Sequence, residues 1–233
     1  YAKRRTRQLR ELGLRGYILK KNSPSCGMTR VKTYTEAGMP APADRGLFAD
    51  ALMTLLPLLP VEEEGRLNDP PLRENFIERI FACYRWTRLL EQDPTPGGLV
   101  RFHTAHKLTL MAHSPAHYTE MGRLVAKAGS EPWDEMVPAY GALLMEGLSM
   151  LGTRGKHANV LQHLMGYLKN ELSTDDKQEL LGLIEEYRQA MVPLIVPLTL
   201  LQHHLRRNPV PEWVWQQVYL SPYPKELMLR NHV

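Results

Sequence analysis

The cysteine at position 26 is placed for thiol chemistry. It lies in the stretch KKNSPSCGM, residues 20–28, directly after a short apolar run that is typical of a strand. Pro24 and Gly27 predict a tight turn, which would hold the thiol in one place. A thiolate held in this way can act as a nucleophile or bind an iron–sulfur cluster. The spacing does not choose between these two uses, because no other cysteine lies nearby in the sequence.

The residues around this turn support either use of the thiol. Ser23 and Ser25 offer hydroxyl groups, and Lys20 and Lys21 would favour the charged thiolate. The second cysteine, Cys83, falls among apolar residues in a helical pattern, where cysteine usually packs as a small hydrophobic side chain. Two such distant cysteines give no disulfide framework, which favours a reducing, cytoplasmic location.

Four histidines gather between residues 103 and 117, close to several basic residues. His103 and His106 are spaced by three residues, while His113 and His117 flank an expected helix start at which Pro115 predicts a break. A zinc site is only weakly indicated, because the chain has no HExxH motif and no cysteine pair. These side chains could contact a polyanion, form an independent metal site, or be satisfied within the fold.

A basic turn that contains glycine, LGTRGKHAN at residues 151–159, leads into another expected helix. A helix N-terminus offers unpaired backbone N–H groups and the positive end of the helix dipole, and both favour anions. Arg154, Lys156 and His157 add positive or hydrogen-bonding side chains to this turn. The pattern predicts a phosphate-binding turn, unless these side chains are used inside the protein.

The charge of the chain is strongly asymmetric. Residues 1–32 contain ten Lys or Arg and one acidic residue, whereas residues 33–233 contain 19 basic and 24 acidic residues. The basic block suits a polyanion such as nucleic acid, or it is a solvated helix face with acidic partners elsewhere in the fold. The longest apolar runs are interrupted and fall short of the roughly 20 residues that a membrane span needs, so we expect no membrane span.

The first sixty residues are typical of the end of an α/β unit. Residues 1–13 predict a helix and residues 16–21 a short buried strand, and the Cys26 turn follows at the carboxyl end of that strand, where open α/β sheets bind ligands. We expect a loop at residues 33–46 and a helix at residues 47–60, stopped by prolines. A lone strand cannot form a sheet and the chain begins with Tyr rather than Met, so we expect either partner strands upstream or packing of this piece against something else.

The rest of the chain is helical in pattern. Residues 61–69 predict a polar linker with solvated glutamates, and residues 70–207 a bundle of about six or seven helices. Asp69 or Asn68 can cap the first of these helices, and we expect Pro138 to interrupt a later one. The expected fold class is therefore mainly α, preceded by the remnant of an α/β domain.

Two parts of the sequence resemble known families. GYILKKNSPSCGM and GLFADALMTLLPLLPVEEEGRLNDPP are similar to the TudS-like thiouracil desulfidase domain, over residues 1 to about 60. FHTAHKLTLMAHSPAHYTEMGRLVA and GTRGKHANVLQHLMGYLKNELS resemble the YbgA-like domain, over nearly all of residues 70–233. The fusion of the two is similar to RudS-type desulfidases, which are linked to the removal of sulfur from 4-thiouridine in tRNA.

The resemblance implies an iron–sulfur enzyme. TudS-like domains hold a [4Fe–4S] cluster by three cysteines, and the remaining iron would bind the sulfur of the thiolated base without net redox change. Cys26 matches the third cluster cysteine. Ser23 matches a serine with a catalytic, hydrogen-bonding role, and Ser25, its neighbour in the same motif, is a second catalytic candidate. The other cysteines and an acidic catalytic residue belong to a part that this sequence does not contain, which implies that this chain alone holds no cluster and is inactive.

The resemblance also implies that the helical domain binds tRNA. Arginine and lysine side chains would contact phosphates, and histidine and tyrosine side chains would stack on bases. The alternative is a helical protein–protein interaction or regulatory domain without RNA contact, which the slightly acidic balance of residues 33–233 favours. The residues expected to contact RNA are Arg85, Arg88, Arg101, His103, His106, Lys107, His113, His117, Tyr118, Arg123, Arg154, Lys156 and His157.

Overall fold

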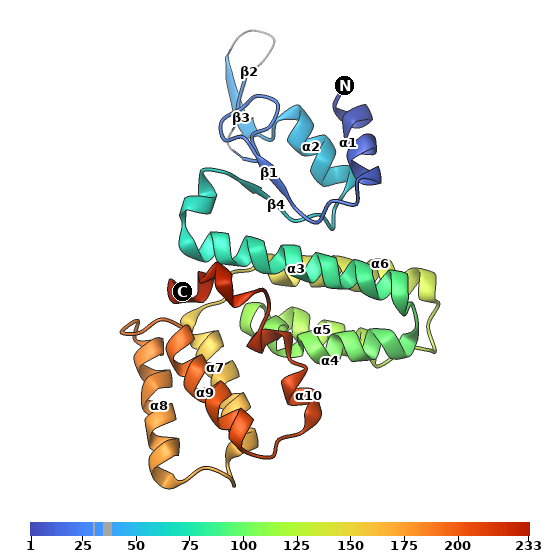
Figure 1. Cartoon of the computed structure of the whole chain (residues 1–233). Helices are drawn as coiled ribbons and strands as arrows, with labels where there is room; N and C mark the ends of the chain where they lie inside the picture. Colours follow the sequence, from blue (N-terminus) through green and yellow to red (C-terminus); the bar gives the residue numbers. More distant parts are fainter. Residues whose placement is uncertain (30, 35–38) are drawn as a thin grey trace. The chain divides into compact units, whose positions relative to one another are not determined.

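A computed structural model of the chain describes residues 1–29, 31–34 and 39–233 and is mainly α-helical, as expected (Figure 1). Arg30 of the basic block and residues 35–38 of the expected loop lie outside the described residues. The chain divides into two compact units, Tyr1–Tyr84 and Arg85–Val233. Helix α3 (Pro70–Gln92) contributes residues to both units.

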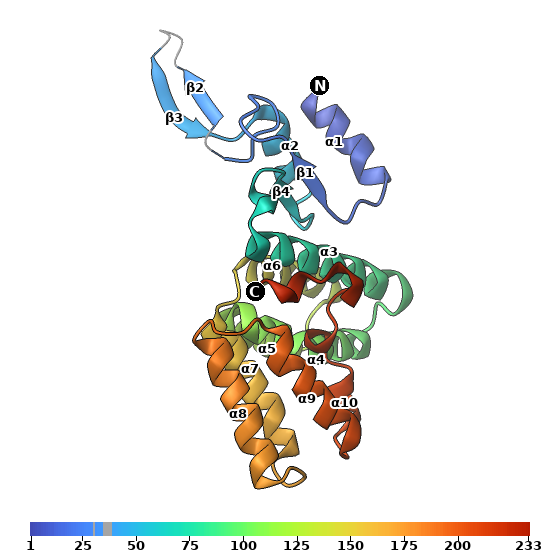
Figure 2. The same ribbon diagram turned by 60° about the vertical axis from the view of Figure 1, so that its left-hand side comes forward.

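The first unit combines helices with two small sheets. Strand β1 pairs in parallel with β4, so that Tyr17 lies opposite Val61, whereas β2 and β3 form an antiparallel ribbon. Figure 2 shows this ribbon extending away from α1 and α2. The elements are α1 (Ala2–Glu11), β1 (Tyr17–Leu19), β2 (Val31–Tyr34), β3 (Pro40–Asp44), α2 (Leu47–Leu55), β4 (Val61–Glu63), a 3₁₀ turn (Arg66–Asn68) and the start of α3.

Two expectations about this unit are corrected. Residues 33–46, expected as a loop, contain most of the β2–β3 ribbon. Residues 61–69, expected as a linker, begin with β4, which gives β1 a partner strand within the chain. Short strands rich in Pro, Ala and Glu carry little strand propensity, so their pairing is set by tertiary contacts that the pattern does not show.

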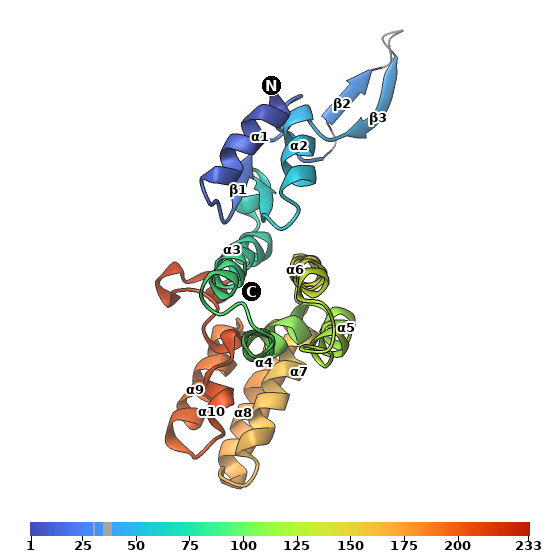
Figure 3. The same cartoon turned by 90° about the vertical axis from the view of Figure 1, so that its right-hand side faces the viewer.

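Helix α2 makes the parallel pairing of β1 and β4 possible. Parallel neighbours need a crossover connection, and α2 lies in the connection between the two strands. It packs beside α1, as Figures 1 and 3 show. The shared core contains Leu9 of α1, Leu19 of β1, Phe48 and Leu52 of α2, and Val61 of β4. This core holds the carboxyl end of β1, and with it the Cys26 turn, against α2.

The second unit is entirely helical over its described residues, which run without a gap. Between residues 70 and 207 the chain forms seven helices, α3 to α9, which confirms the expected number. The elements after α3 are α4 (Pro96–His113), α5 (Pro115–Val125), α6 (Trp133–Ser149), α7 (Arg154–Met165), α8 (Thr174–Arg188), α9 (Ile195–Arg207) and α10 (Glu212–Trp215), with 3₁₀ turns at Gly166–Leu168, Val218–Leu220, Lys225–Leu227 and Leu229–Asn231.

Side-chain caps define the starts of five helices, α3, α4, α5, α7 and α8. Asp69 accepts the N–H of Leu72 at 3.0 Å, and Ser114 separates α4 from α5 as expected, with Pro115 in the first turn. Pro138 does not interrupt α6 but lies inside it. It is the sixth residue of the helix, so it removes one backbone hydrogen bond, and the burial of neighbouring residues such as Met136 and Tyr140 offsets this cost.

Leucines and aromatic residues form the core of the second unit. Helices α7, α8 and α9 pack through side chains such as Leu161, Ile184 and Leu201, all nearly inaccessible to solvent. Trp86 of α3 stacks on Tyr140 of α6, with ring centroids 5.1 Å apart. Among the described residues, no helix has both the length and the hydropathy needed to cross a membrane.

Candidate functional site

The Cys26 turn is held by the side chain and the carbonyl of Ser23. The Ser23 hydroxyl oxygen accepts the backbone N–H of Ser25 at 3.3 Å and that of Cys26 at 3.1 Å. The Ser23 carbonyl accepts the N–H of Gly27 at 2.8 Å. This arrangement is the same as a helix N-cap, in which one serine satisfies N–H groups that would otherwise lack an acceptor. The half-buried thiol of Cys26 is therefore fixed by its own backbone.

Helix α2 locks the turn from the other side. The carbonyl of Ser25 accepts the N–H groups of Phe48 at 2.8 Å and Ala49 at 3.1 Å, both in the first turn of α2. The N–H of Gly46 donates to the carbonyl of Gly27 at 2.8 Å. The first N–H groups of a helix have no partner within the helix, so the turn caps α2 while α2 orients the turn.

Two glycines allow this close approach. A Cβ atom on Gly46 would lie 2.4 Å from the carbonyl carbon of Ser25 and 2.9 Å from the nitrogen of Cys26. A Cβ atom on Gly27 would lie 2.3 Å from a methyl group of Val31. Because the atoms around Gly46 belong to the backbone and cannot rotate away, the contact between α2 and the turn requires a glycine there.

The glutamates of the VEEEG stretch hold both ends of the turn-containing loop. Glu63 accepts the N–H of Met28 at 2.7 Å, and Glu64 accepts the N–H of Lys21 at 2.8 Å and pairs with the Lys20 ammonium at 2.8 Å. The expectation that these glutamates are solvated is wrong for Glu62 and Glu63, which are each only 3% exposed. Sequence reasoning missed this role, although acidic residues at a strand end beside a loop with unpaired N–H groups would have been a signal.

The second buried glutamate of this stretch is paired with arginines. Glu62 accepts the Nε–H of Arg66 at 2.7 Å, and its other oxygen lies 4.0 Å from the guanidinium of Arg79. Burial lowers the pKa of Arg79, and Glu62 opposes this effect. The pair satisfies a carboxylate that would be costly to bury alone, so Glu62 is a structural residue of the first unit.

The described residues supply one thiol for a cluster and no complete metal site. Neither cysteine forms a disulfide bond, and no group of three or more His, Cys, Asp or Glu in the described part of the chain is arranged to hold a metal ion. Cys83 is buried, which raises the pKa of its thiol, and it behaves as the expected core residue. The same search gives no support to a metal site among the histidines.

Three of the residues expected to contact RNA are exposed arginines. Arg88 and Arg123 make no hydrogen bond or ion pair with other described residues, and both are accessible. Arg101 is also exposed but forms an ion pair with Asp93; a hydrogen bond from Thr95, followed by the contact with Arg101, lowers the pKa of that carboxyl. Arg88 and Arg123 are therefore the most available for a polyanion.

Two histidines of α4 lie inside the helical unit. The Nδ1 atom of His103 is 3.2 Å from the hydroxyl of Tyr140, and burial, with a smaller contribution from Lys107, lowers the pKa of His103 to about 4. His106 bonds through Nδ1 to the carbonyl of Phe102 at 2.8 Å and stacks on that ring. Both side chains are buried, so they are not available for base stacking in this structure.

Three further residues expected to contact RNA, Lys107 of α4 and His117 and Tyr118 of α5, are partly buried. The Lys107 ammonium lies 3.6 Å from the centroid of the Trp213 ring, and burial lowers its pKa. His117 bonds to the hydroxyl of Ser114 at 2.8 Å. Tyr118 lies parallel to the His103 ring, with centroids 6.3 Å apart. Each of these side chains contributes to packing between helices.

The basic side chains of the expected phosphate-binding turn are directed at protein acceptors. Arg154 donates to the carbonyls of Tyr187 at 3.1 Å and Val192 at 3.3 Å. Lys156 donates to the carbonyl of His113 at 2.6 Å, and His157 is buried and bonded to the hydroxyl of Tyr219 at 3.0 Å. The turn ties α7 to its neighbours, which is the internal use that the sequence left open.

Arg85 and His113, the last two residues expected to contact RNA, also bond to carbonyls within the protein. Arg85 donates to the carbonyl of Pro222, and His113 bonds to the carbonyl of Met150 at 2.6 Å. Both contacts join segments far apart in the sequence. The structure thus uses the histidines and most of the basic residues of the set in internal contacts, and leaves Arg88, Arg101 and Arg123 on the surface.

Comparison with known proteins matches the two parts of the chain to two families. Residues 1–64 match the family described as 2-thiouracil desulfurase, and residues 107–224 match the family described as "Protein of unknown function (DUF1722)". The "Uncharacterized protein YbgA" of Escherichia coli (strain K12) is 32% identical over 159 residues, which cover 68% of this chain and 94% of the relative. No solved structure matches. The chain therefore belongs to the YbgA-like family DUF1722, and carries a 2-thiouracil desulfurase segment before the family's helical part.

Proposed function

We propose that this protein removes sulfur from thiolated uracil in tRNA, converting 4-thiouridine to uridine and releasing sulfide. The observation that carries the proposal is the Cys26 turn, in which Ser23 and α2 fix a half-buried thiol at the carboxyl end of a parallel strand. The match of residues 1–64 to 2-thiouracil desulfurases supports the choice of reaction. The helical unit is then the part that binds the RNA.

Ser23 is suited to contact the substrate. A serine hydroxyl has two acceptor lone pairs and one O–H donor. The backbone N–H groups of Ser25 and Cys26 use the acceptor capacity, so the O–H of Ser23 remains to donate. A donor next to Cys26 can hold the oxygen or sulfur of a thiolated base in place. The hydroxyl of Ser25 makes no hydrogen bond with other described residues, so no such bond fixes its orientation as the two N–H groups fix that of Ser23.

Cys26 fits one ligand position of a [4Fe–4S] cluster, the cofactor that the resemblance implies. The described residues place no further ligands beside it, and Cys83 is buried in a helix elsewhere in the unit. The residues present therefore do not fit a complete cluster site, and no reaction step is assigned to the cluster. Because such a cluster needs more cysteines than this chain offers, we infer that the chain by itself has no desulfurase activity.

Support for RNA binding comes from exposed, unpaired arginines in the helical unit. Arg88 and Arg123 can contact phosphates without first breaking an internal bond. The buried histidines instead support the fold. The proposal is tested by incubating the natural protein that contains this sequence with thiolated tRNA under anaerobic conditions and measuring 4-thiouridine and uridine by nucleoside mass spectrometry. Unchanged 4-thiouridine with cluster-loaded protein would contradict it.

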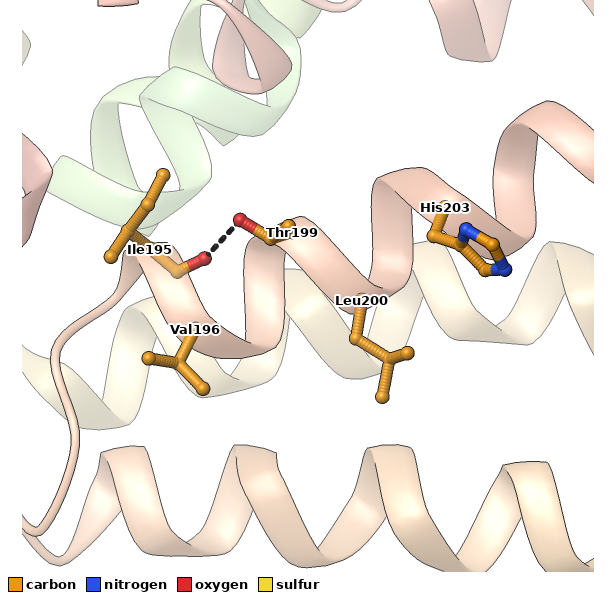
Figure 4. Close-up of a pocket in the computed structure, with 5 residues that line it drawn as sticks. All are labelled: Ile195, Val196, Thr199, Leu200 and His203. Carbon is orange, nitrogen blue, oxygen red and sulfur yellow. Dashed lines mark hydrogen bonds between the residues drawn. The ribbon is translucent and has the colours of Figure 1, made fainter.

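A second candidate for the helical unit is protein binding without RNA contact. A groove of about 560 Å³ runs along α9 and is lined by Ile195, Val196, Thr199, Leu200 and His203 (Figure 4). The lining is mostly apolar, and four basic residues of the expected RNA-binding set, Arg85, Lys107, Arg154 and Lys156, are already engaged inside the unit. Binding of the helical unit to tRNA with no dependence on salt, or no binding at low salt, would favour this second function.

A further inference from the structure

A cleft in the first unit opens beside the Cys26 turn, between α1 and α2. Its volume is about 830 Å³, and its lining includes Lys3 and Arg7 of α1, Ser25 of the turn, and Phe48, Asp50 and Thr54 of α2. All of these residues belong to one compact unit, in which α1 and α2 lie side by side (Figure 3). Ser25 is the residue directly before Cys26, so the cleft reaches the candidate site.

The α1 wall of the cleft is positively charged and available. Lys3 and Arg7 are four residues apart and therefore share one face of the helix. Both are exposed, and neither makes a hydrogen bond or ion pair with other described residues. Arg10 of the same helix, by contrast, donates to the carbonyl of Leu55 at 2.8 Å. The two unpaired cations line the cleft, while other basic residues of α1 lie outside its lining.

The floor of the cleft is apolar. Phe48 is buried and packs against Tyr17, with ring centroids 5.8 Å apart, and Ala51 follows it on the same face of α2. An apolar floor beside a cationic wall matches a single nucleic-acid strand, whose sugars and bases are partly apolar and whose phosphates are anionic. One carboxylate, Asp50, also lines the cleft and opposes an anion there.

We propose that this cleft binds the RNA strand that carries the thiolated base, with Lys3 and Arg7 contacting its phosphates next to the Cys26 turn. The inference rests on the proposed function and adds a substrate-binding site in the first unit. It gives two cations of the basic block at residues 1–32 a ligand, whereas Lys20 of the same block pairs with an acidic partner, Glu64. The ligand class is a single-stranded nucleotide phosphate chain, in contrast to a folded RNA surface.

The test measures binding of a short single-stranded oligoribonucleotide that contains one 4-thiouridine, by fluorescence anisotropy at several salt concentrations. The K3Q/R7Q double variant should bind more weakly and lower the slope of log affinity against log salt by about 1.4, since each phosphate contact to a single strand contributes about 0.7. The matched control is R4Q/R5Q, which removes the same charge from the same helix outside the cleft lining. D50N should bind more tightly, because it removes the opposing charge.

A second measurement locates the bound strand and separates this inference from the RNA role of the helical unit. Photo-crosslinking through the 4-thiouridine should label peptides from residues 1–29 or 46–55, and K3Q/R7Q should lose the label while keeping its circular dichroism spectrum. R88Q/R123Q should leave the binding of the short oligonucleotide and the crosslinked peptides unchanged, even if it weakens tRNA binding. The inference is overturned if K3Q/R7Q and R4Q/R5Q lose the same affinity for the oligonucleotide, or if labelling is confined to the helical unit. It is also overturned if an acidic peptide competes for the cleft as well as the oligonucleotide does.

Discussion

The hydroxyl oxygen of Ser23 lies 3.1 Å from the backbone nitrogen of Cys26 and accepts its N–H. This bond joins the serine of the motif directly to its cysteine. A thiol that is fixed through its own backbone loses little further conformational freedom when it binds a ligand. The three-residue spacing between Ser23 and Cys26 is therefore explained by the hydrogen bond that forms the turn, independently of any reaction.

Replacing Ser23 should loosen the turn, whereas replacing Ser25 should not. Ser23→Ala removes the acceptor of two N–H groups, and the loss of such a cap typically costs about 1 kcal/mol. The amide hydrogens of Ser25 and Cys26 should then exchange faster with deuterium, as measured by mass spectrometry of the peptide. Ser25→Ala is the control, because the Ser25 hydroxyl has no partner among the described residues. Equal protection in the two variants would contradict the capping role.

Adding a methyl group at Gly46 should displace the Cys26 turn. Its Cβ atom would overlap backbone atoms of Ser25, so either α2 or the turn must move, and we expect a loss of about 1–3 kcal/mol in the stability of the first unit. Thermal unfolding and hydrogen exchange of residues 23–28 measure the effect. Gly65→Ala is a control in the same unit, since its one close contact would be with Cδ of the flexible Lys21 side chain and not with backbone atoms. Equal stability and equal hydrogen exchange in Gly46→Ala and Gly65→Ala would contradict the close contact at Gly46.

The helices could be predicted from the sequence because their signals are local. Asp69, Ser114 and Ser173 are side chains that cap the helices following them, and the apolar period within each helix predicts its buried face. The number of helices between residues 70 and 207 was therefore correct. The β1–β4 pairing could not be predicted in this way, because its strands are three residues long and lie more than forty residues apart.

The candidate site was predictable only in part, for the same physical reason. Pro24 and Gly27 indicate a turn from local sequence, but the contacts of Gly46 and Glu63 with that turn depend on the folded chain. In the helical unit, residue type alone does not separate Lys156, whose ammonium donates to a buried carbonyl, from Arg88, which is exposed. Whether a basic side chain is engaged or exposed depends on its burial in the folded chain, and the sequence pattern of basic residues does not show that burial.

The stability of the helical unit should decrease as the pH falls from about 6.5 toward 4. Burial lowers the pKa of His103 to about 4, whereas the imidazole of the unfolded chain titrates near 6.5. Between these values the unfolded chain binds a proton that the folded chain does not, so the free energy of unfolding drops by up to about 3 kcal/mol. Below pH 4 this contribution levels off, because both states are then protonated.

The variant His103→Gln should reduce that pH dependence. Urea unfolding followed by tryptophan fluorescence reports on the second unit, since Trp86, Trp133, Trp213 and Trp215 all lie within it. His232→Gln, at an exposed position, is the control and should leave the pH dependence unchanged. A parallel pH profile for wild type and His103→Gln would show that His103 is not responsible.

The exposed arginines of the helical unit should carry its contact with tRNA. R88Q/R123Q is expected to weaken tRNA binding and to reduce the salt slope by about 1 for each lost phosphate contact. The comparison variant is R206Q/R207Q, which removes two exposed charges at the end of α9 in the same unit. Filter binding or anisotropy at several salt concentrations measures both. If the comparison variant loses as much affinity, the effect is one of total charge and not of this surface.

Sulfide release from thiolated tRNA by cysteine variants tests the central claim most directly. The natural protein that contains this sequence, purified and incubated with iron and sulfide under anaerobic conditions, should release sulfide and leave uridine in the tRNA. Cys26→Ala should abolish the release, while Cys83→Ala, which changes a buried thiol away from the turn, should retain it in protein that remains folded. Full sulfide release by Cys26→Ala would contradict the assignment of the Ser23–Cys26 turn as the site.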